Sequence, residues 1–267
     1  MKKQLILLKL GGSLITDKNR AFYAKQKVIS RLAREIKASL SGKFDLIIGH
    51  GSGSFGHVVA SKYHTQDGII NKRSIRGLSL VADAAIQINR IVMGEFLKAK
   101  LPVISFAPAS FMTASNQNLD RVLTKQIKTS LKIGIIPVIY GDVILDDKQG
   151  CCIFSGEKTL DILAKSLKDK YQNVKIILCG DTNGVLDTNG NTIPKISSKS
   201  FKNISSSVGK SAGIDVTGGM IHKVETSLKL VSDFGIETRI MNGKASGKLK
   251  RALLEDDDED TTLIINA

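Results

Sequence analysis

Short apolar runs, several of them ending in glycine, alternate along the chain with longer segments in which apolar residues recur every three or four positions. The runs are typical of buried strands, and the longer segments are typical of amphipathic helices. Strands are predicted at Leu5–Leu10, Asp45–Gly49, Pro102–Phe106, Ile135–Tyr140, Lys175–Cys179, Glu237–Met241 and Thr262–Ile265. Helices are predicted at Val28–Leu40, Gly56–Tyr63, within Ser74–Lys100, and at Thr124–Leu131, Thr159–Tyr171, Met220–Phe234 and Gly247–Leu254.

This alternation predicts an α/β fold with a mainly parallel sheet. Helices that cover both faces of such a sheet leave the loops at the carboxyl ends of the strands to build a site, and the glycine-rich segments fall in those loops. Asp146–Gly150 is a different case, since it is typical of a hairpin turn between strands at Val143–Leu145 and Cys151–Phe154.

The 267 residues are consistent with a single domain, because no linker or internal repeat divides them. Two low-complexity patches stand out, the serine-rich Ser197–Ser211 and the acidic Glu255–Asp260. We expect the first to be a mobile surface excursion. The second is expected to be an exposed loop before the last strand, without a function of its own.

The chain is strongly basic, with 39 Lys and Arg against 25 Asp and Glu and a formal charge of +14. A nucleic-acid-binding protein is one interpretation of this charge. It is disfavoured because there is no Trp, aromatic residues make up only 5% of the chain, and no basic strip with interleaved aromatics is present. The preferred interpretation is a lysine-rich surface around a site for small phosphates.

The sequence favours a cytoplasmic location. Cys151, Cys152 and Cys179 cannot form a disulfide framework and lack the spacing of metal ligands. The apolar start of the chain is interrupted by Lys9 and is not followed by a cleavage site of small residues. No apolar stretch reaches the roughly 18 residues of a membrane span, so no membrane partner is expected.

The first candidate anion site is Lys9-Leu10-Gly11-Gly12-Ser13, at the end of the first strand, with Lys18 nine residues after Lys9. Glycines allow close approach of the backbone to a ligand, and a lysine supplies positive charge for phosphate. An ordinary strand-end turn would explain the glycines equally well, and the lysine could simply extend its ammonium group to solvent.

The second candidate is His50-Gly51-Ser52-Gly53-Ser54-Phe55-Gly56-His57, between a strand and a helix. It formally contains the G-x-G-x-x-G pattern of dinucleotide-binding folds, but the next convincing strand begins only near Pro102, too far away for that unit. What remains is an anion site made by amides at the start of a helix. His57 is expected in the first turn of that helix, where it could donate to the anion.

Three further glycine-rich junctions precede or follow predicted elements: Ser155-Gly156-Glu157, Gly180–Val185, and Asp215–Met220 with Lys223 in the following helix. Each could be an ordinary cap or turn. Gly209-Lys210-Ser211 is not a P-loop, because Ile204 occupies the position of the required leading glycine. Several such junctions in one α/β chain favour phosphoryl transfer, a reaction that depends on positioning and charge neutralisation.

Together these motifs resemble the amino-acid-kinase superfamily and, within it, the isopentenyl phosphate kinases. The segments that match, in the family's order, are Lys9–Ser13 with Thr16–Lys18, Gly53–His57, Gly141–Val143, Ser155-Gly156, and Asp215–Met220 with Lys223. They span residues 9 to 223, and the histidine after Gly-Ser-Phe-Gly is the most specific of them.

The resemblance implies a three-layer sandwich, usually in a homodimer, that transfers the γ-phosphoryl group of ATP to isopentenyl phosphate and forms isopentenyl diphosphate without a covalent enzyme intermediate. Residues 1–170 would hold the acceptor, and residues 171–267 would hold ATP with Mg²⁺. The implied ATP ligands are Lys9, Gly11, Gly12, Ser13 and Gly53 at the phosphates, with Asp181, Gly219 and Lys223 elsewhere on the nucleotide side. The acceptor phosphate would be held by Ser52, His57 and Gly156. The implied catalytic residues are Lys9, Lys18, His57 and Glu157.

The sequence departs from the family's pattern at two positions. Ser52 replaces the second glycine of His-Gly-Gly-Gly, and Glu157 replaces the aspartate of Ser-Gly-Asp, which helps to orient the lysines in related kinases. These departures leave two alternatives open: a kinase for another small phosphate or phosphonate, such as fosfomycin, and a regulatory protein that binds nucleotide without turnover. Candidates for the pocket of the acceptor's tail are Ile86, Met93, Phe106 and Phe111.

Overall fold

The large sheet lies at the centre of the protein. The structure is a computed structural model that describes residues 3–187, 189–201, 218–256 and 260–266. In this part of the chain the strand order is β10-β12-β11-β9-β1-β2-β6-β3, and neighbours are parallel except β11 and β12. The strands are β1 (Gln4–Leu10), β2 (Phe44–His50), β3 (Val103–Phe106), β6 (Ile136–Tyr140), β9 (Asn173–Gly180), β10 (Lys195–Ile196), β11 (Glu237–Asn242) and β12 (Thr261–Ile264). The predicted α/β class with a mainly parallel sheet is confirmed.

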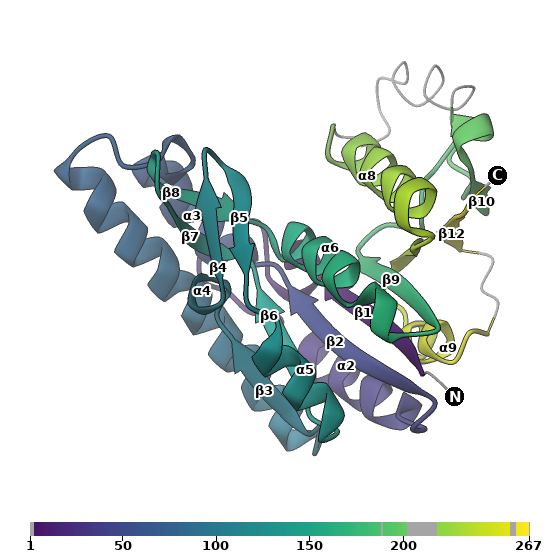
Figure 1. Ribbon diagram of the computed structural model, residues 1–267. Helices are drawn as coiled ribbons and strands as arrows, with labels where there is room; N and C mark the ends of the chain where they lie inside the picture. Colours follow the sequence, from purple (N-terminus) through teal and green to yellow (C-terminus); the bar gives the residue numbers. More distant parts are fainter. Residues whose placement is uncertain (1–2, 188, 202–217, 257–259, 267) are drawn as a thin grey trace.

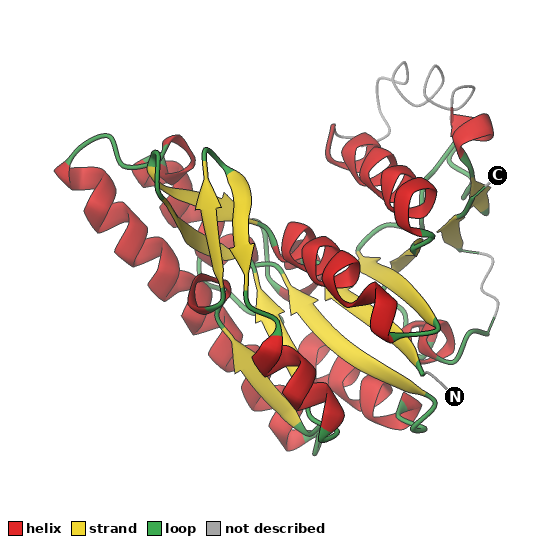
Figure 2. Ribbon diagram, in the orientation of Figure 1, coloured by secondary structure: helices red, strands yellow, loops and turns green. Residues whose placement is uncertain are grey.

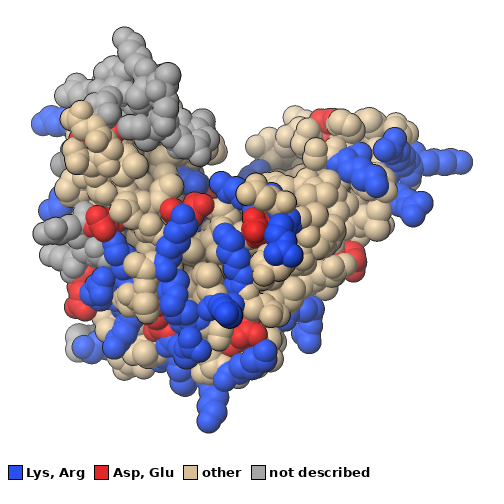
Figure 3. Space-filling view, turned by 180° about the vertical axis from the view of Figure 1, so that it is seen from behind, with Lys and Arg blue, Asp and Glu red and all other residues tan. Residues whose placement is uncertain are grey.

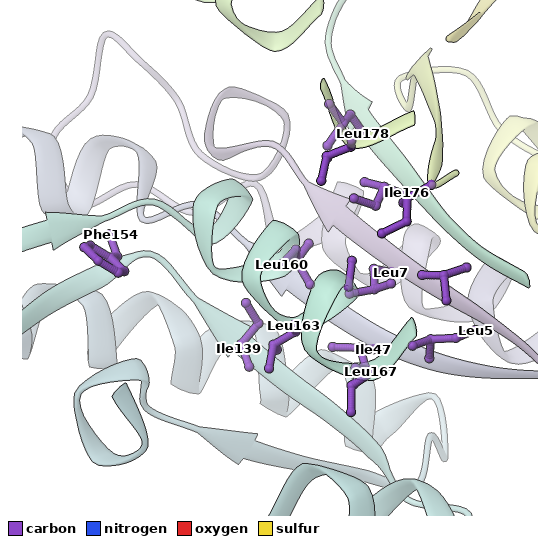
Figure 4. Packing of buried hydrophobic residues seen from close by; sticks show 14 of the residues in the cluster. Leu5, Leu7, Ile47, Ile139, Phe154, Leu160, Leu163, Leu167, Ile176 and Leu178 are labelled. Atoms are coloured by element: carbon purple, nitrogen blue, oxygen red, sulfur yellow. The ribbon is translucent and has the colours of Figure 1, made fainter. Parts of the chain in front are cut away.

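Helices cover both faces of this sheet and complete a three-layer sandwich (Figure 1). One face packs against α2 (Gln26–Ser39), α4 (Lys72–Lys98) and α9 (Lys248–Leu253), and the other against α5 (Lys125–Lys132), α6 (Gly156–Leu167) and α8 (Gly218–Phe234). Alternate residues of β1 pack against the two helix layers, because successive side chains of a strand point to opposite faces of the sheet. Leu5 and Leu7 belong to the α6 side, where Leu160 and Leu163 pack over them (Figure 4), and Ile6 belongs to the α2 side.

A second, smaller sheet packs against α4 at one end of the molecule (Figure 2). Its strands, in spatial order, are β5 (Asn118–Val122), β4 (Met112–Ser115), β7 (Asp142–Asp146) and β8 (Gly150–Phe154). Asp146 joins the β4–β5 turn to the β7–β8 turn of this sheet. Its carboxylate accepts hydrogen bonds from the backbone N–H groups of Asn116 and Gln117 in the first turn and of Lys148 and Gln149 in the second. Burial opposes the ionisation of Asp146, but these four donors outweigh it and lower its pKa.

The predicted strands and helices are all present, with ends shifted by a few residues. The hairpin β7–β8 is confirmed, but β4, β5 and β10 were not predicted, and neither were the single-turn α1 (Gly12–Ile15) and the 3₁₀ turns η1 (Thr65–Asp67), η2 (Pro108–Ser110) and η3 (Lys168–Lys170). β4 and β5 escape prediction because they are short and mostly polar, so they lack a clear apolar alternation.

The acidic run is partly anchored to the body of the protein. Glu255 accepts hydrogen bonds from Lys175 Nζ at 2.7 Å and Gln4 Nε2 at 2.9 Å, and Asp260 pairs with Lys248 Nζ at 2.6 Å. Residues 257–259 lie outside the described residues, and so do residues 202–211 of the predicted serine-rich excursion.

Basic side chains are distributed over the surface. Figure 3 shows Lys and Arg scattered over the lower part of one face and at the end of its projecting part, with fewer Asp and Glu between them, rather than gathered in a single stripe. Among the described helices, none combines the length and the apolar character needed to cross a membrane.

Candidate active site

Four neighbouring parallel strands, β9, β1, β2 and β6, end at the same edge of the sheet. The residues that follow them are those of the glycine-rich segments: Asp181 after β9, Gly11 after β1, Gly51 after β2 and Gly141 after β6. The topology therefore brings segments that are far apart in the sequence to one edge, as expected for the site of an α/β sheet.

The loops after β1 and β2 touch through their backbones. A Cβ atom added to Gly12 would lie 2.9 Å from the Cα and N atoms of Gly53, and one added to Gly51 would lie 3.0 Å from the N atom of Gly12. Gly53 has φ +50°, and a Cβ there would overlap the hydroxyl oxygen of Thr16. Glycine is required at these positions because the two backbones approach too closely for side chains.

A pocket of about 520 Å³ opens above these loops, and we call it the larger pocket. It lies between the starts of α1, α6 and α3 (Gly53–Tyr63), and α3, α4 and β8 contribute its apolar side chains. Its polar and glycine lining consists of Lys9, Gly12, Ser13, Thr16, Lys18, Gly51, Ser52, Gly53, Ser54, Gly56, His57, Gly141, Asp142, Ser155, Gly156 and Glu157. Its apolar lining is Val58, Ala60, Val81, Ala85 and Ile153.

A second cavity of about 70 Å³, the smaller pocket, lies on the other side of the β1 loop, towards β9 and β11. Its lining is Lys9, Gly11, Gly12, Ser13, Leu178, Cys179, Gly180, Asp181, Thr182, Met220, Lys223, Ile240 and Met241. Lys9, Gly12 and Ser13 therefore line both pockets.

Lys9 forms an ion pair at the boundary between the pockets. Its Nζ lies 3.0 Å from Oε2 of Glu157, and the two side chains are only 15% and 21% exposed. Burial, followed by the positive charge of Lys9, lowers the pKa of Lys223, while Glu157 and Asp181 oppose this shift. The boundary therefore holds several positive charges, with the carboxylates of Glu157 and Asp181 among them.

Comparison with known proteins agrees with this geometry. A family model described as the amino acid kinase family matches residues 4–242. The chain belongs to this family.

Curated relatives place the chain close to one group of amino acid kinases. The isopentenyl phosphate kinase of Methanocaldococcus jannaschii is 33% identical, over 94% of this chain and 95% of the relative. That of Methanothermobacter thermautotrophicus is 32% identical over the same shares. A crystal structure of an isopentenyl phosphate kinase superposes with a TM-score of 0.74 at 28% identity, covering 97% of this chain and 100% of the other. The predicted fold and the predicted family are confirmed.

Most of the residues predicted for an amino acid kinase site are brought together. Those at the larger pocket are Lys9, Gly12, Ser13, Lys18, Ser52, Gly53, His57, Gly156 and Glu157. Gly11, Asp181 and Lys223 lie at the smaller pocket. Gly219 is exposed and lines neither pocket, and Asp215, Val216 and Thr217 of the same motif lie outside the described residues.

One prediction about the acceptor loop is wrong. Helix α3 begins at Gly53 and not at Gly56, so His57 lies in the second turn of the helix instead of the first. Two amides of the expected anion site are also engaged within the protein, since Ser54 N donates to Thr16 Oγ1 and Phe55 N to the carbonyl oxygen of Ser52. His57 itself is exposed at the mouth of the larger pocket.

The departure at Ser52 places no strain on the loop. Ser52 has φ −77° and ψ −16°, a right-handed conformation that any L-residue adopts. Its side chain packs against Gly56, where an added Cβ would overlap the Ser52 hydroxyl. Glu157 also fits, because its longer side chain reaches Lys9.

The apolar lining was not predicted. None of Ile86, Met93, Phe106 and Phe111 lines the larger pocket. Instead α4 supplies Val81 and Ala85, which are four residues apart and therefore on one face of the helix. That face could have been found from the spacing, but the sequence does not reveal which end of a 27-residue helix reaches the site.

Asp142 is a buried acid at the larger pocket that sequence analysis assigned to a motif but not to a role. It is 5% exposed, and Oδ1 accepts a hydrogen bond from Val143 N at 2.8 Å. Burial raises its pKa to about 7, although that hydrogen bond opposes the shift.

Proposed function

We propose that the protein transfers the γ-phosphoryl group of ATP to isopentenyl phosphate, with the acceptor in the larger pocket and the nucleotide in the smaller one. The single observation that supports this division best is that Lys9 lines both pockets, since the transferred group must pass between donor and acceptor. The curated relatives that match nearly the whole chain are isopentenyl phosphate kinases, which favours the same acceptor.

In this proposal an oxygen of the acceptor phosphate attacks the γ-phosphorus of ATP, and the bond from that phosphorus to the β-γ bridging oxygen breaks. An acceptor dianion and ATP together carry the same charge as the diphosphate product and ADP, so no proton has to move. The protein then needs cations and N–H donors rather than a general base, and Lys9, Lys18 and the backbone N–H groups of Gly53 and Gly156 in the lining of the larger pocket supply them.

The other residues of the two pockets hold Lys9, the acceptor and the nucleotide in place. Glu157 holds Lys9 between the pockets through the 3.0 Å ion pair. Ser52, His57 and Gly156 bind the acceptor phosphate, and the apolar group of Val58, Val81, Ala85 and Ile153 surrounds its hydrocarbon tail. Lys223 and Asp181 face the nucleotide. Mg²⁺ would neutralise phosphate charge on ATP, and the oxygen ligand that Asp181 offers is of the kind it prefers.

A coupled assay of ADP release tests this function. The acceptor panel contains isopentenyl phosphate, fosfomycin and N-acetylglutamate, each with and without Mg²⁺, together with a reaction that lacks acceptor. We expect Mg²⁺-dependent turnover that is fastest with isopentenyl phosphate. Preference for fosfomycin would indicate a phosphonate kinase, and nucleotide binding without turnover on any acceptor would indicate a regulatory protein.

The same proposal includes a cytoplasmic homodimer. β3 forms one edge of the large sheet, and exposed apolar side chains lie on or near it, namely Leu97, Ile104 and Ile133. Apolar residues on an exposed edge strand suit a second copy of the same chain. Size-exclusion chromatography with light scattering should give a dimer for the wild type and a monomer for Ile104→Glu, and a monomeric wild type would contradict the assignment.

A further inference from the structure

His50 is a fully buried polar residue that the proposed mechanism does not use. It is the last residue of β2, and its side chain has 0% exposure. Nδ1 lies 3.1 Å from the carbonyl oxygen of Gly51, and Nε2 lies 3.2 Å from Oδ1 of Asn89 on α4. Its ring stacks on Tyr140 with centroids 5.7 Å apart. A buried polar group of this kind needs partners that match its donors and acceptors.

The hydrogen-bond partners of the two ring nitrogens are compatible with only one protonation form of His50. Both ring nitrogens lie against oxygen atoms, yet a neutral imidazole has a single N–H. Burial lowers the pKa of His50, which disfavours the imidazolium that could donate to both. Rotating the Asn89 amide by 180° resolves the conflict. Asn89 Nδ2 then donates to Nε2, the Ser105 hydroxyl donates to Asn89 Oδ1 across the present 2.8 Å contact, and Nδ1–H donates to Gly51.

This bond to Gly51 determines where the next amide points. The Gly51 carbonyl and the Ser52 N–H belong to one trans peptide unit, so they point in opposite directions. A carbonyl held toward the buried His50 ring therefore turns the Ser52 N–H away from the core. Within the described residues that N–H makes no hydrogen bond, and Ser52 lines the larger pocket.

The same histidine joins the loop after β2 to the rest of the larger pocket. Its carbonyl oxygen accepts a hydrogen bond from Gly141 N at 3.0 Å, and a Cβ added to Gly156 would lie 2.6 Å from that oxygen. Asn89 lies four residues after Ala85 and eight after Val81, on the face of α4 that forms the apolar wall. His50 thus contacts three glycine-containing loops and, through Asn89, the helix behind them.

We propose that His50, as the Nδ1–H tautomer, is a positioning residue that fixes the Gly51–Ser52 peptide so that the Ser52 N–H faces the acceptor phosphate. The assignment of that phosphate to the larger pocket rests on the proposed function. His50 does not contact the acceptor and transfers no proton.

Two variants separate the nitrogens. In His50→Asn the amide nitrogen takes the place of Nδ1, and in His50→Gln it lies nearer to Nε2. We expect His50→Gln to raise the acceptor KM by about tenfold or more, and His50→Asn to raise it by less than about threefold, with the ATP KM unchanged in both. Ser105→Ala is the matched control: it shortens the same buried chain at its far end, so it should lower Tm while leaving the acceptor KM within about twofold.

Equal increases in KM for Asn and Gln, or an increase in the ATP KM instead, would overturn the positioning role. ¹⁵N NMR of the histidine-labelled protein tests it without any substitution at His50. The other three histidines, His57, His64 and His222, are exposed, so the His50 signal is the one that persists in the spectra of the His57→Gln, His64→Gln and His222→Gln variants. We expect a protonated Nδ1 and an unprotonated Nε2. An Nε2–H tautomer would overturn the proposal whatever the acceptor is, whereas an error in the acceptor would leave the tautomer unaffected.

Discussion

The two pockets differ in how closely other atoms approach their glycines. At the larger pocket a Cβ added to Gly51 or Gly53 would lie 3.0 Å or less from backbone atoms of Gly12, whereas at the smaller pocket a Cβ added to Gly180 would meet no atom within 4 Å. Open space accepts an added atom, but closely packed backbones cannot turn away from one. The larger pocket should therefore be more sensitive to added atoms, and the smaller one more tolerant of them.

Loss of the lysines should produce the largest effects, because Lys9 belongs to both pockets. We expect Lys9→Ala and Lys18→Ala each to lower kcat by about 10² or more with little change in Tm, since each cation offsets charge on the transferring group. Steady-state kinetics and thermal melts measure the two quantities. Lys27→Ala, an exposed lysine on α2 that lines neither pocket, is the control. Wild-type turnover in either variant would remove that lysine from the site.

A pair of glycine variants tests this contrast. Gly51→Ala, at the larger pocket alone, would place Cβ 3.0 Å from the backbone N of Gly12, whereas Gly180→Ala at the smaller pocket would meet no atom within 4 Å. We expect Gly51→Ala to cost about 1–3 kcal/mol of stability and to raise the acceptor KM, and Gly180→Ala to change stability by about 0.5 kcal/mol or less. Chemical denaturation gives the two stabilities, and steady-state kinetics gives the KM. Equal losses would show that the pockets are equally adaptable.

His57 tests which ligand occupies the larger pocket. His57→Ala should raise the KM for isopentenyl phosphate by about tenfold and also lower kcat, because a loosely held phosphate attacks from a poorer geometry. His57→Gln should recover part of the loss, since its amide keeps one N–H donor, and the ATP KM should stay almost unchanged. A variant that weakens ATP binding and spares the acceptor would mean that the two pockets are assigned the wrong way round.

The contrast also explains how much could be predicted from the sequence. The strand-end glycines and lysines were found because strand, glycine and lysine are adjacent in the chain, as at Lys9–Gly12. The start of α3 was misplaced because Gly53 and Gly56 are typical of loops, although both lie within a helix. The partnership of His50 with Asn89 joins residues 39 positions apart, and no local pattern predicts such a contact.

Glu157 should have a smaller effect than the lysine that it holds. Glu157→Asp is expected to keep kcat within about tenfold, because a shorter carboxylate remains near Lys9, and Glu157→Ala should lose substantially more. Initial rates at saturating ATP and acceptor measure this difference. If the alanine variant is as active as the wild type, Glu157 is only an acid at the start of α6, favoured there by the helix dipole.

Asp142 should give the smallest effect, and that effect should depend on pH. Burial raises the pKa of this acid in the folded protein to about 7, whereas an unfolded aspartate ionises near 3.9. As the pH rises above about 4, the unfolded chain loses this proton more readily than the folded one, so the wild type loses stability up to about pH 7 and then no further. Asp142→Asn keeps an oxygen for Val143 N and removes the titration. The Tm of the variant minus that of the wild type should therefore increase from pH 5 to pH 8, by about 2 °C or more. Other groups titrate alike in both proteins, so their contributions cancel in this difference in Tm. A difference that does not change between pH 5 and 8 would mean that Asp142 ionises as easily as an exposed acid. The larger pocket would then be more hydrated than the burial of Asp142 indicates.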